Sequence, residues 1–101
     1  MKLREIAYAR EGDKADIANI AVLPYEDADW PRIREALTED VVRRKFGDLM
    51  TGTVTRYEYP NLPALNFVLT EALGGGVSLS LRVDGHGKSY ASLMLDIDID
   101  G

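Results

Sequence analysis

The sequence has no cysteine and a single histidine, His86, which lies between two glycines. The absence of thiols excludes disulfides, thiolate metal sites and cysteine nucleophiles, and it fits a reducing compartment. One histidine in a turn-forming stretch is too little for a zinc site, and a catalytic triad would need it buried against a carboxylate. We therefore expect neither a metal nor a cofactor.

Long hydrophobic runs are also missing. No apolar stretch approaches the ~20 residues that a membrane-spanning helix needs. Residues 1–5 include charged side chains and lack the uninterrupted apolar core of a signal peptide. We expect a cytoplasmic protein that does not bind membranes.

The sequence also lacks an excess of basic residues. It has 12 Lys and Arg against 17 Asp and Glu, which gives a net charge of −5. Such a charge repels polyanions, so we expect no nucleic-acid partner. The densest basic cluster, residues 43–45, is flanked by acidic residues. We interpret it as the last turn of a helix, where cations interact favourably with the helix dipole.

What the sequence does contain is the composition of one globular domain. Its 101 residues are 46% hydrophobic and 29% charged, which is enough to bury a core without covalent cross-links. We find no repeat, linker or low-complexity stretch, and we expect a single domain over residues 1–101. The pattern predicts the order β-β-α(α)-β-α-β-β over residues 3–9, 17–23, 29–47, 51–59, 61–73, 79–83 and 91–99.

Capping and periodicity support these elements. Thr38 and Gly47 are suitable N-terminal and C-terminal caps for the second half of the first helical region. Asn61 with Pro63 just inside predicts the start of another helix, with Leu62, Leu65 and Leu69 as part of its buried stripe. Apolar residues at every odd position from 91 to 99 predict a strand, which follows a turn at 84–87. The economical arrangement is an α+β two-layer sandwich, a largely antiparallel sheet with two helical segments on one face.

The first group of candidate functional residues lies in the polar segment 10–16, which we expect to be a loop. Arg10, Asp13, Lys14 and, just beyond, Asn19 place charged and amide groups between two strands, where binding groups are often found. Asp13 and Lys14 would make an acid–base pair if they were buried together. The alternative is a solvated turn with local hydrogen bonds.

A second group surrounds the predicted helix 61–73. Asn66 lies one position from its apolar stripe, and the Gly74, Gly75 and Gly76 turn offers backbone N–H groups to an anion. The alternative for the glycines is a helix C-cap with a sharp chain reversal. Arg56 and Arg82 are either carboxylate clamps or partners of Glu58 and Asp84, and we favour the ion pairs. We expect Asp96, Asp98 and Asp100 to form a solvated strand end rather than a cation site.

Three parts of the sequence together resemble the AtuA-like ferredoxin-fold domain: residues 10–20, residues 59–69, and residues 72–78 with 80–82 and 84–88. The likeness spans about residues 4–97. Carried over position by position, the motif residues would be Arg10, Gly12, Asp13, Lys14, Asn19, Asn61, Asn66, Gly74, Gly75, Gly76 and Arg82. The chain departs from the motif at Glu11 and Ala15, where the family has serine and glycine.

The resemblance implies a ferredoxin-like fold, found alone or fused behind a larger domain related to acyclic terpene utilisation protein A. Those larger proteins are associated with the breakdown of branched terpenoid acids and with acyl-CoA metabolism. Our leading hypothesis is an accessory domain or subunit that binds such a larger chain through its sheet face or its 74–76 turn. The alternatives are a carboxylate-binding or acyl-CoA-binding domain or enzyme that uses Asp13 and Lys14, with Arg82 as the clamp, and a self-assembling homo-oligomer.

Overall fold

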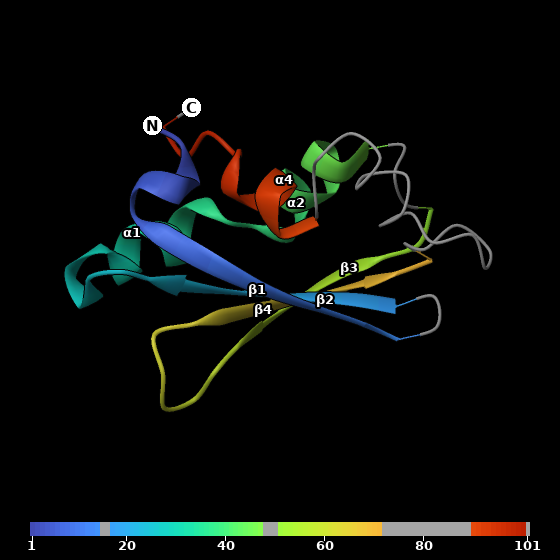
Figure 1. Cartoon of the computed structure of the whole chain (residues 1–101), viewed down its shortest axis with the longest axis horizontal. Helices are drawn as coiled ribbons and strands as arrows, with labels where there is room; N and C mark the ends of the chain where they lie inside the picture. The colour runs from blue at the N-terminus through green and yellow to red at the C-terminus, as the bar shows by residue number, and fades with distance from the viewer. Residues whose placement is uncertain (15–16, 48–50, 72–89, 101) are drawn as a thin grey trace.

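A computed structural model of the chain describes residues 1–14, 17–47, 51–71 and 90–100. Its four strands form one sheet in the order β1-β2-β4-β3, and every pair of neighbours is antiparallel. The strands are β1 (Ala7–Lys14), β2 (Ile17–Pro24), β3 (Val54–Glu58) and β4 (Leu65–Thr70). The helices are α1 (Trp30–Ala36), α2 (Glu39–Phe46) and α4 (Tyr90–Leu95), with short 3-10 turns η1 (Leu3–Glu5) and η2 (Asp27–Asp29). These helices all cover the same face of the sheet (Figure 1).

The connection from β2 to β3 defines the topology. Both strands lie antiparallel to β4, which separates them, so β2 and β3 run parallel and the α1–α2 segment crosses from one to the other. This is the split βαβ arrangement of ferredoxin-like folds. Strand β1 takes the edge position beside β2. The predicted α+β sandwich, a largely antiparallel sheet with helices on one face, is confirmed.

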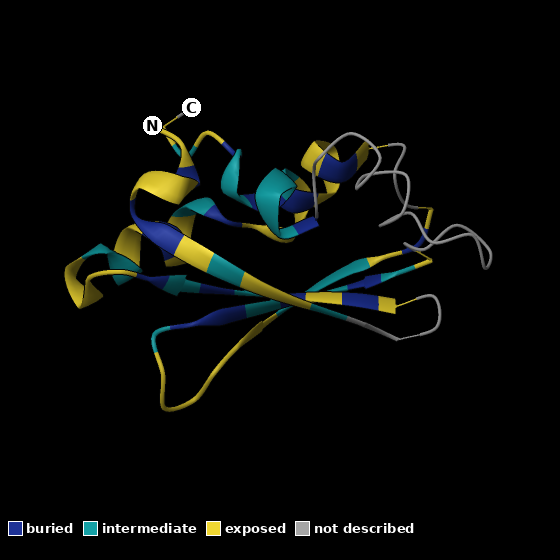
Figure 2. Ribbon diagram, in the orientation of Figure 1, coloured by how far each residue is buried: buried dark blue, intermediate teal, exposed yellow. Residues whose placement is uncertain are grey.

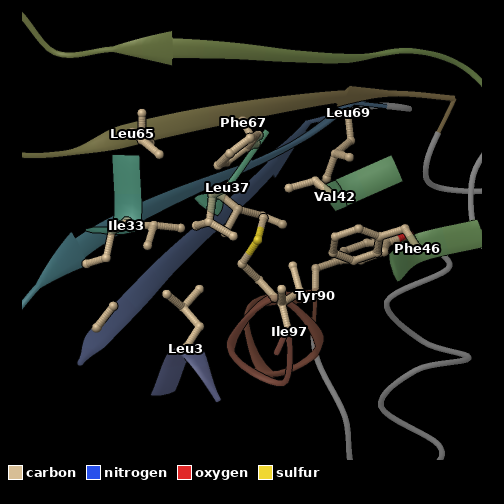
Figure 3. Close-up of a cluster of buried hydrophobic side chains, with 14 of the residues drawn as sticks. Leu3, Ile33, Leu37, Val42, Phe46, Leu65, Phe67, Leu69, Tyr90 and Ile97 are labelled. Carbon is tan, nitrogen blue, oxygen red and sulfur yellow. The ribbon is translucent and has the colours of Figure 1, made fainter. Parts of the chain in front are cut away.

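The core lies between the sheet and the helices. The central strands bury every second side chain: Ala18, Ile20 and Val22 on β2, and Leu65, Phe67 and Leu69 on β4. These pack in one cluster with residues of η1, the helices and their connections, among them Leu3, Ile33, Leu37, Val42, Phe46, Tyr90, Met94 and Ile97 (Figure 3). The rings of Phe46 and Tyr90 lie with centroids 5.4 Å apart and join α2 to α4. The buried core is therefore continuous from the sheet to the helices that cover it.

The predicted helix over 61–73 is wrong, because residues 65–70 form β4. Leucines at 62, 65 and 69 fit a helical stripe, but the buried residues follow a period of two. Phe67, Val68 and Thr70 also favour a strand. Asn61 is not a helix cap, since it lies in the connection between β3 and β4. That connection projects from the end of the sheet (Figure 1).

The predicted strand over 91–99 is also wrong, because Tyr90–Leu95 is the helix α4. Five apolar residues at odd positions suggest alternation, yet the buried side chains are Tyr90, Met94 and Ile97, which have helical spacing. The expected partner strand 79–83, the turn 84–87 and His86 lie outside the described residues.

The N-terminal half follows the sequence prediction more closely. Strand β2 lies where it was predicted, and β3 lies inside the predicted range 51–59. Thr38 caps α2, since its hydroxyl accepts the Val41 N–H at 3.1 Å, and Gly47 ends that helix with φ of 48°. The basic cluster occupies the last turn of α2 as expected. The first strand is the exception: it begins at Ala7 after the turn η1 and continues to Lys14, so most of the predicted polar loop is strand.

The segments at the two ends of the chain lie together and are joined by ion pairs (Figure 1). The Met1 amine bonds to Asp100 and Asp98 at 3.0 and 3.2 Å, which raises its pKa above the ordinary value of 8.0. The backbone N–H of Asp100 and the same amine lower the pKa of Asp98. Arg4 pairs with Asp96, and Arg32 pairs with Asp100. These aspartates follow the helix α4 instead of ending a strand, and they bind the chain ends together while Asp98 and Asp100 stay exposed to solvent.

Gly52 gives a test of the packing between the segment before β3 and the end of β4. A Cβ at this buried glycine would lie 2.3 Å from the carbonyl oxygen of Thr70. We therefore expect Gly52→Ala to lower the free energy of unfolding by about 1–3 kcal/mol, measured by urea denaturation. Gly12→Ala is the control, because its Cβ would meet the Asn19 amide at an ordinary 3.5 Å. Equal stability of the two variants would contradict this packing.

Candidate functional site

The sheet has a second face, which is turned away from the described helices (Figure 2). Residues paired across antiparallel strands point to the same face, so the register and the burial pattern fix its members. We call these residues the outer face: Tyr8, Arg10 and Gly12 of β1; Ile17, Asn19, Ala21 and Leu23 of β2; Thr55 and Tyr57 of β3; and Asn66, Val68 and Thr70 of β4. Every strand contributes to this surface.

Three of the candidate site residues meet on the outer face, although they come from separate parts of the sequence. Arg10 pairs with Ala21, and Ala21 pairs with Asn66 on its other side. Asn19 lies in the next row, between Gly12 and Val68. Neighbouring strands are about 4.8 Å apart. The Arg10 and Asn66 backbones are therefore about 10 Å apart, which lets both side chains reach one bound group.

Aromatic and aliphatic side chains surround these polar groups. Tyr57 is the register partner of Asn66 and is 55% exposed, and Ile17 is 45% exposed. Tyr8 is 38% exposed, and its ring lies 5.4 Å from that of Tyr25. Large apolar groups in contact with water on one face are typical of a surface that binds another molecule.

Arg10, Asn19 and Asn66 of the outer face make no described side-chain contact that holds the fold, whereas the hydroxyl of Thr70 accepts the Thr53 N–H at 2.8 Å. Within the part of the chain that the structure describes, no hydrogen bond or ion pair involves the side chain of Arg10, Asn19 or Asn66. The described arginines elsewhere do have partners: Arg4, Arg32, Arg34, Arg43, Arg44 and Arg56 each contact a carboxylate or a backbone carbonyl. Arg10 is thus the one described arginine that has no described partner, which suits it to bind an anionic group.

The structure does not describe the side chains of the other predicted site residues. The backbones of Asp13 and Lys14 belong to β1 and pair with Ala18 and Ile17, while their side chains lie outside what the structure describes. The acid–base pair remains a prediction. The Gly74–Gly76 turn and Arg82 also lie outside the described residues.

Glu11 shows a role that the sequence analysis missed. It pairs with the buried Ile20, so it lies on the helix-covered face, and its Oε1 accepts the Ala91 N–H of α4 at 3.1 Å. A carboxylate at this end of a helix also interacts favourably with the dipole. The alternation of Ala7, Ala9 and Glu11 was the available signal, since it continues the inward side of a strand past the predicted loop start.

Arg56 is likewise structural. Its Nη1 donates to the Leu37 carbonyl at 2.6 Å, and its backbone N–H donates to Glu39 Oε2 at 2.8 Å. The predicted ion pair with Glu58 is present at 3.9 Å. Because the Glu39 carboxylate occupies an edge N–H of β3, it opposes pairing of that edge with another strand.

The described residues contain no group of three His, Asp or Glu that could hold a metal ion. Shallow hollows lie beside α1, lined by Ala36, Val41, Arg44, Asp98 and Ile99, and between α1 and β3, lined by Pro31, Arg34, Glu35, Arg56 and Glu58. These hollows lie on the helical side of the domain. The described part of the outer face presents amides, tyrosines and the guanidinium of Arg10, and its chemistry suits binding.

The comparisons with known proteins agree with the resemblance in the sequence. The model of the AtuA ferredoxin-like domain family matches residues 1–100. Neither the search of curated proteins nor the search of solved structures gives a significant match. In the described ranges, no helix has the length and apolar character to cross a membrane.

Adjacent residues on β1 test the assignment of faces. We expect Arg10→Ala to change the free energy of unfolding by no more than about 0.5 kcal/mol, because the outer-face guanidinium has no partner in the described structure. Glu11→Ala should cost about 1 kcal/mol, because it removes the acceptor for the Ala91 N–H. Chemical denaturation of the two variants measures both values, and a larger loss for Arg10→Ala would reverse the assignment.

Proposed function

This chain belongs to the AtuA ferredoxin-like domain family, and from that premise we propose that it is an accessory domain or subunit of a larger AtuA-like protein. In this proposal the outer face docks onto the larger chain. The assembly acts in the catabolism of branched acids or terpenoid acyl-CoA compounds, which is the metabolism that the family resemblance implies.

One observation carries the proposal: the helices occupy one face of the sheet, and motif residues without described partners occupy the other. Arg10, Asn19 and Asn66 all lie on the outer face and form no described side-chain bond. Exposed Tyr57 and Ile17 flank them. A rigid sheet that presents tyrosines, amides and an arginine has the composition of the core of a protein interface, where Tyr and Arg are enriched.

A catalytic role has less support from the described residues. Substrate pockets are concave and bury most of a small ligand, whereas the outer face spans one side of a four-stranded sheet. An enzyme that uses Asp13 and Lys14 would need their side chains beside such a pocket. The docking role requires only the exposed residues already described, so we favour it.

Co-expression with the larger AtuA-like chain, followed by gel filtration, tests the proposal. We expect the two chains to elute together at micromolar concentration, because an interface of ordinary size supports such affinity. Separate elution of two folded proteins at that concentration would contradict it. Circular dichroism of each fraction verifies that both proteins are folded.

A further inference from the structure

The charges of this acidic domain are divided between its two sides. The net charge of the whole chain is −5, yet the outer face as described contains no Asp or Glu. Among the described side chains of this face, only the guanidinium of Arg10 is charged. The described carboxylates lie in the helical layer, its connections, the chain ends and the helix-covered side of the sheet, where several of them pair with arginines.

Arg10 is also surrounded by uncharged neighbours. On its own strand the adjacent outer-face residues are Tyr8 and Gly12, and the residue opposite is Ala21. Gly12 and Ala21 are small, so they leave room beside the guanidinium. In apolar surroundings, an arginine forms its strongest interaction with a carboxylate that binds it in a bidentate manner. The two charged groups are then both shielded from water.

A second copy of the chain would not supply that carboxylate in a symmetric pair. A two-fold interface joins the same surface on both subunits, so it would bring one Arg10 face against another with no described acidic residue between them. Two chains of charge −5 also repel each other at long range. The charge distribution thus opposes a homodimer formed through this face.

We infer that the occupant of the outer face is a different protein, which presents an Asp or Glu side chain to Arg10 within a ring of apolar contacts to Tyr8, Tyr57 and Ile17. This inference rests on the proposed docking function and adds its chemistry. Arginine and tyrosine at the centre of an interface commonly provide most of the binding energy. The β1 side of the outer face is then the centre of recognition, and the acidic helical side remains in solvent.

Binding of the larger AtuA-like chain to Arg10→Glu tests the inference, with the dissociation constant measured by titration calorimetry. We expect binding at least about 100-fold weaker than that of the wild type, because the substitution places two carboxylates together in a desolvated contact. Arg10→Lys should bind between the two, since lysine keeps the charge and loses the bidentate geometry. Lys45→Glu makes the same change of charge at an exposed position of α2 and is the control. It should bind like the wild type.

The outcomes separate the two proposals. If the wild type binds and Arg10→Glu binds with the same affinity, the inference is overturned and the docking function stays intact. Equal loss for Arg10→Glu and Lys45→Glu would also overturn it, because the effect would then be one of net charge. Absence of wild-type binding would remove the docking function itself. A wild-type dimer in light scattering that Arg10→Glu abolishes would show a second copy as the occupant, against the inference.

Discussion

Alternation along the two central strands is the constraint on which the rest of the structure depends. Ile20 on β2 and Phe67 on β4 are register partners and are fully buried. Because successive side chains point to opposite faces, burying these residues commits Asn19 and Asn66 to the outer face. A shift of one residue in the register would bury the amides and expose the apolar side chains, which makes the pairing strongly specified.

In the described part of the chain, the helical layer and the chain ends hold this sheet from one side. Glu11 ties β1 to α4, and Arg56 ties β3 to the segment between α1 and α2. The amine of Met1 and the carboxylates of Asp98 and Asp100 join the two ends. Each of these contacts lies on the helical side of the sheet. The outer face is therefore supported from the helical side, and none of these contacts uses the side chain of Arg10, Asn19 or Asn66.

The sequence predicts the first half of this fold well, because its signals are local. Thr38, Gly47 and the β-branched run of β3 each specify their own structure. It fails at residues 61–73, where leucine spacing fits both a helix and a strand and the pairing of β4 between β2 and β3 decides. It fails again at 90–95, where Tyr90 and Met94 pack as helix residues although apolar and other residues alternate in the sequence. Both errors concern segments whose structure depends on tertiary contacts.

The same distinction applies to the candidate site. Arg10, Asn19 and Asn66 could be selected from residue type and family motif, but their convergence depends on β2 and β4 being neighbours. Glu11 was assigned to a loop because β1 was predicted to end too early, and its contact with Ala91 joins residues far apart in the sequence. Local patterns thus identify which side chains are candidates, and the strand order decides which of them act together.

The central claim is that the outer face, and no other surface, receives the larger AtuA-like chain. Cross-saturation NMR tests it directly, with this domain deuterated and the larger chain irradiated. The account predicts loss of amide signal intensity at outer-face positions such as Arg10, Tyr57 and Asn66, with the exposed residues of α2 unaffected. Loss of intensity along α2 and the chain ends, with the outer face unchanged, would contradict the account.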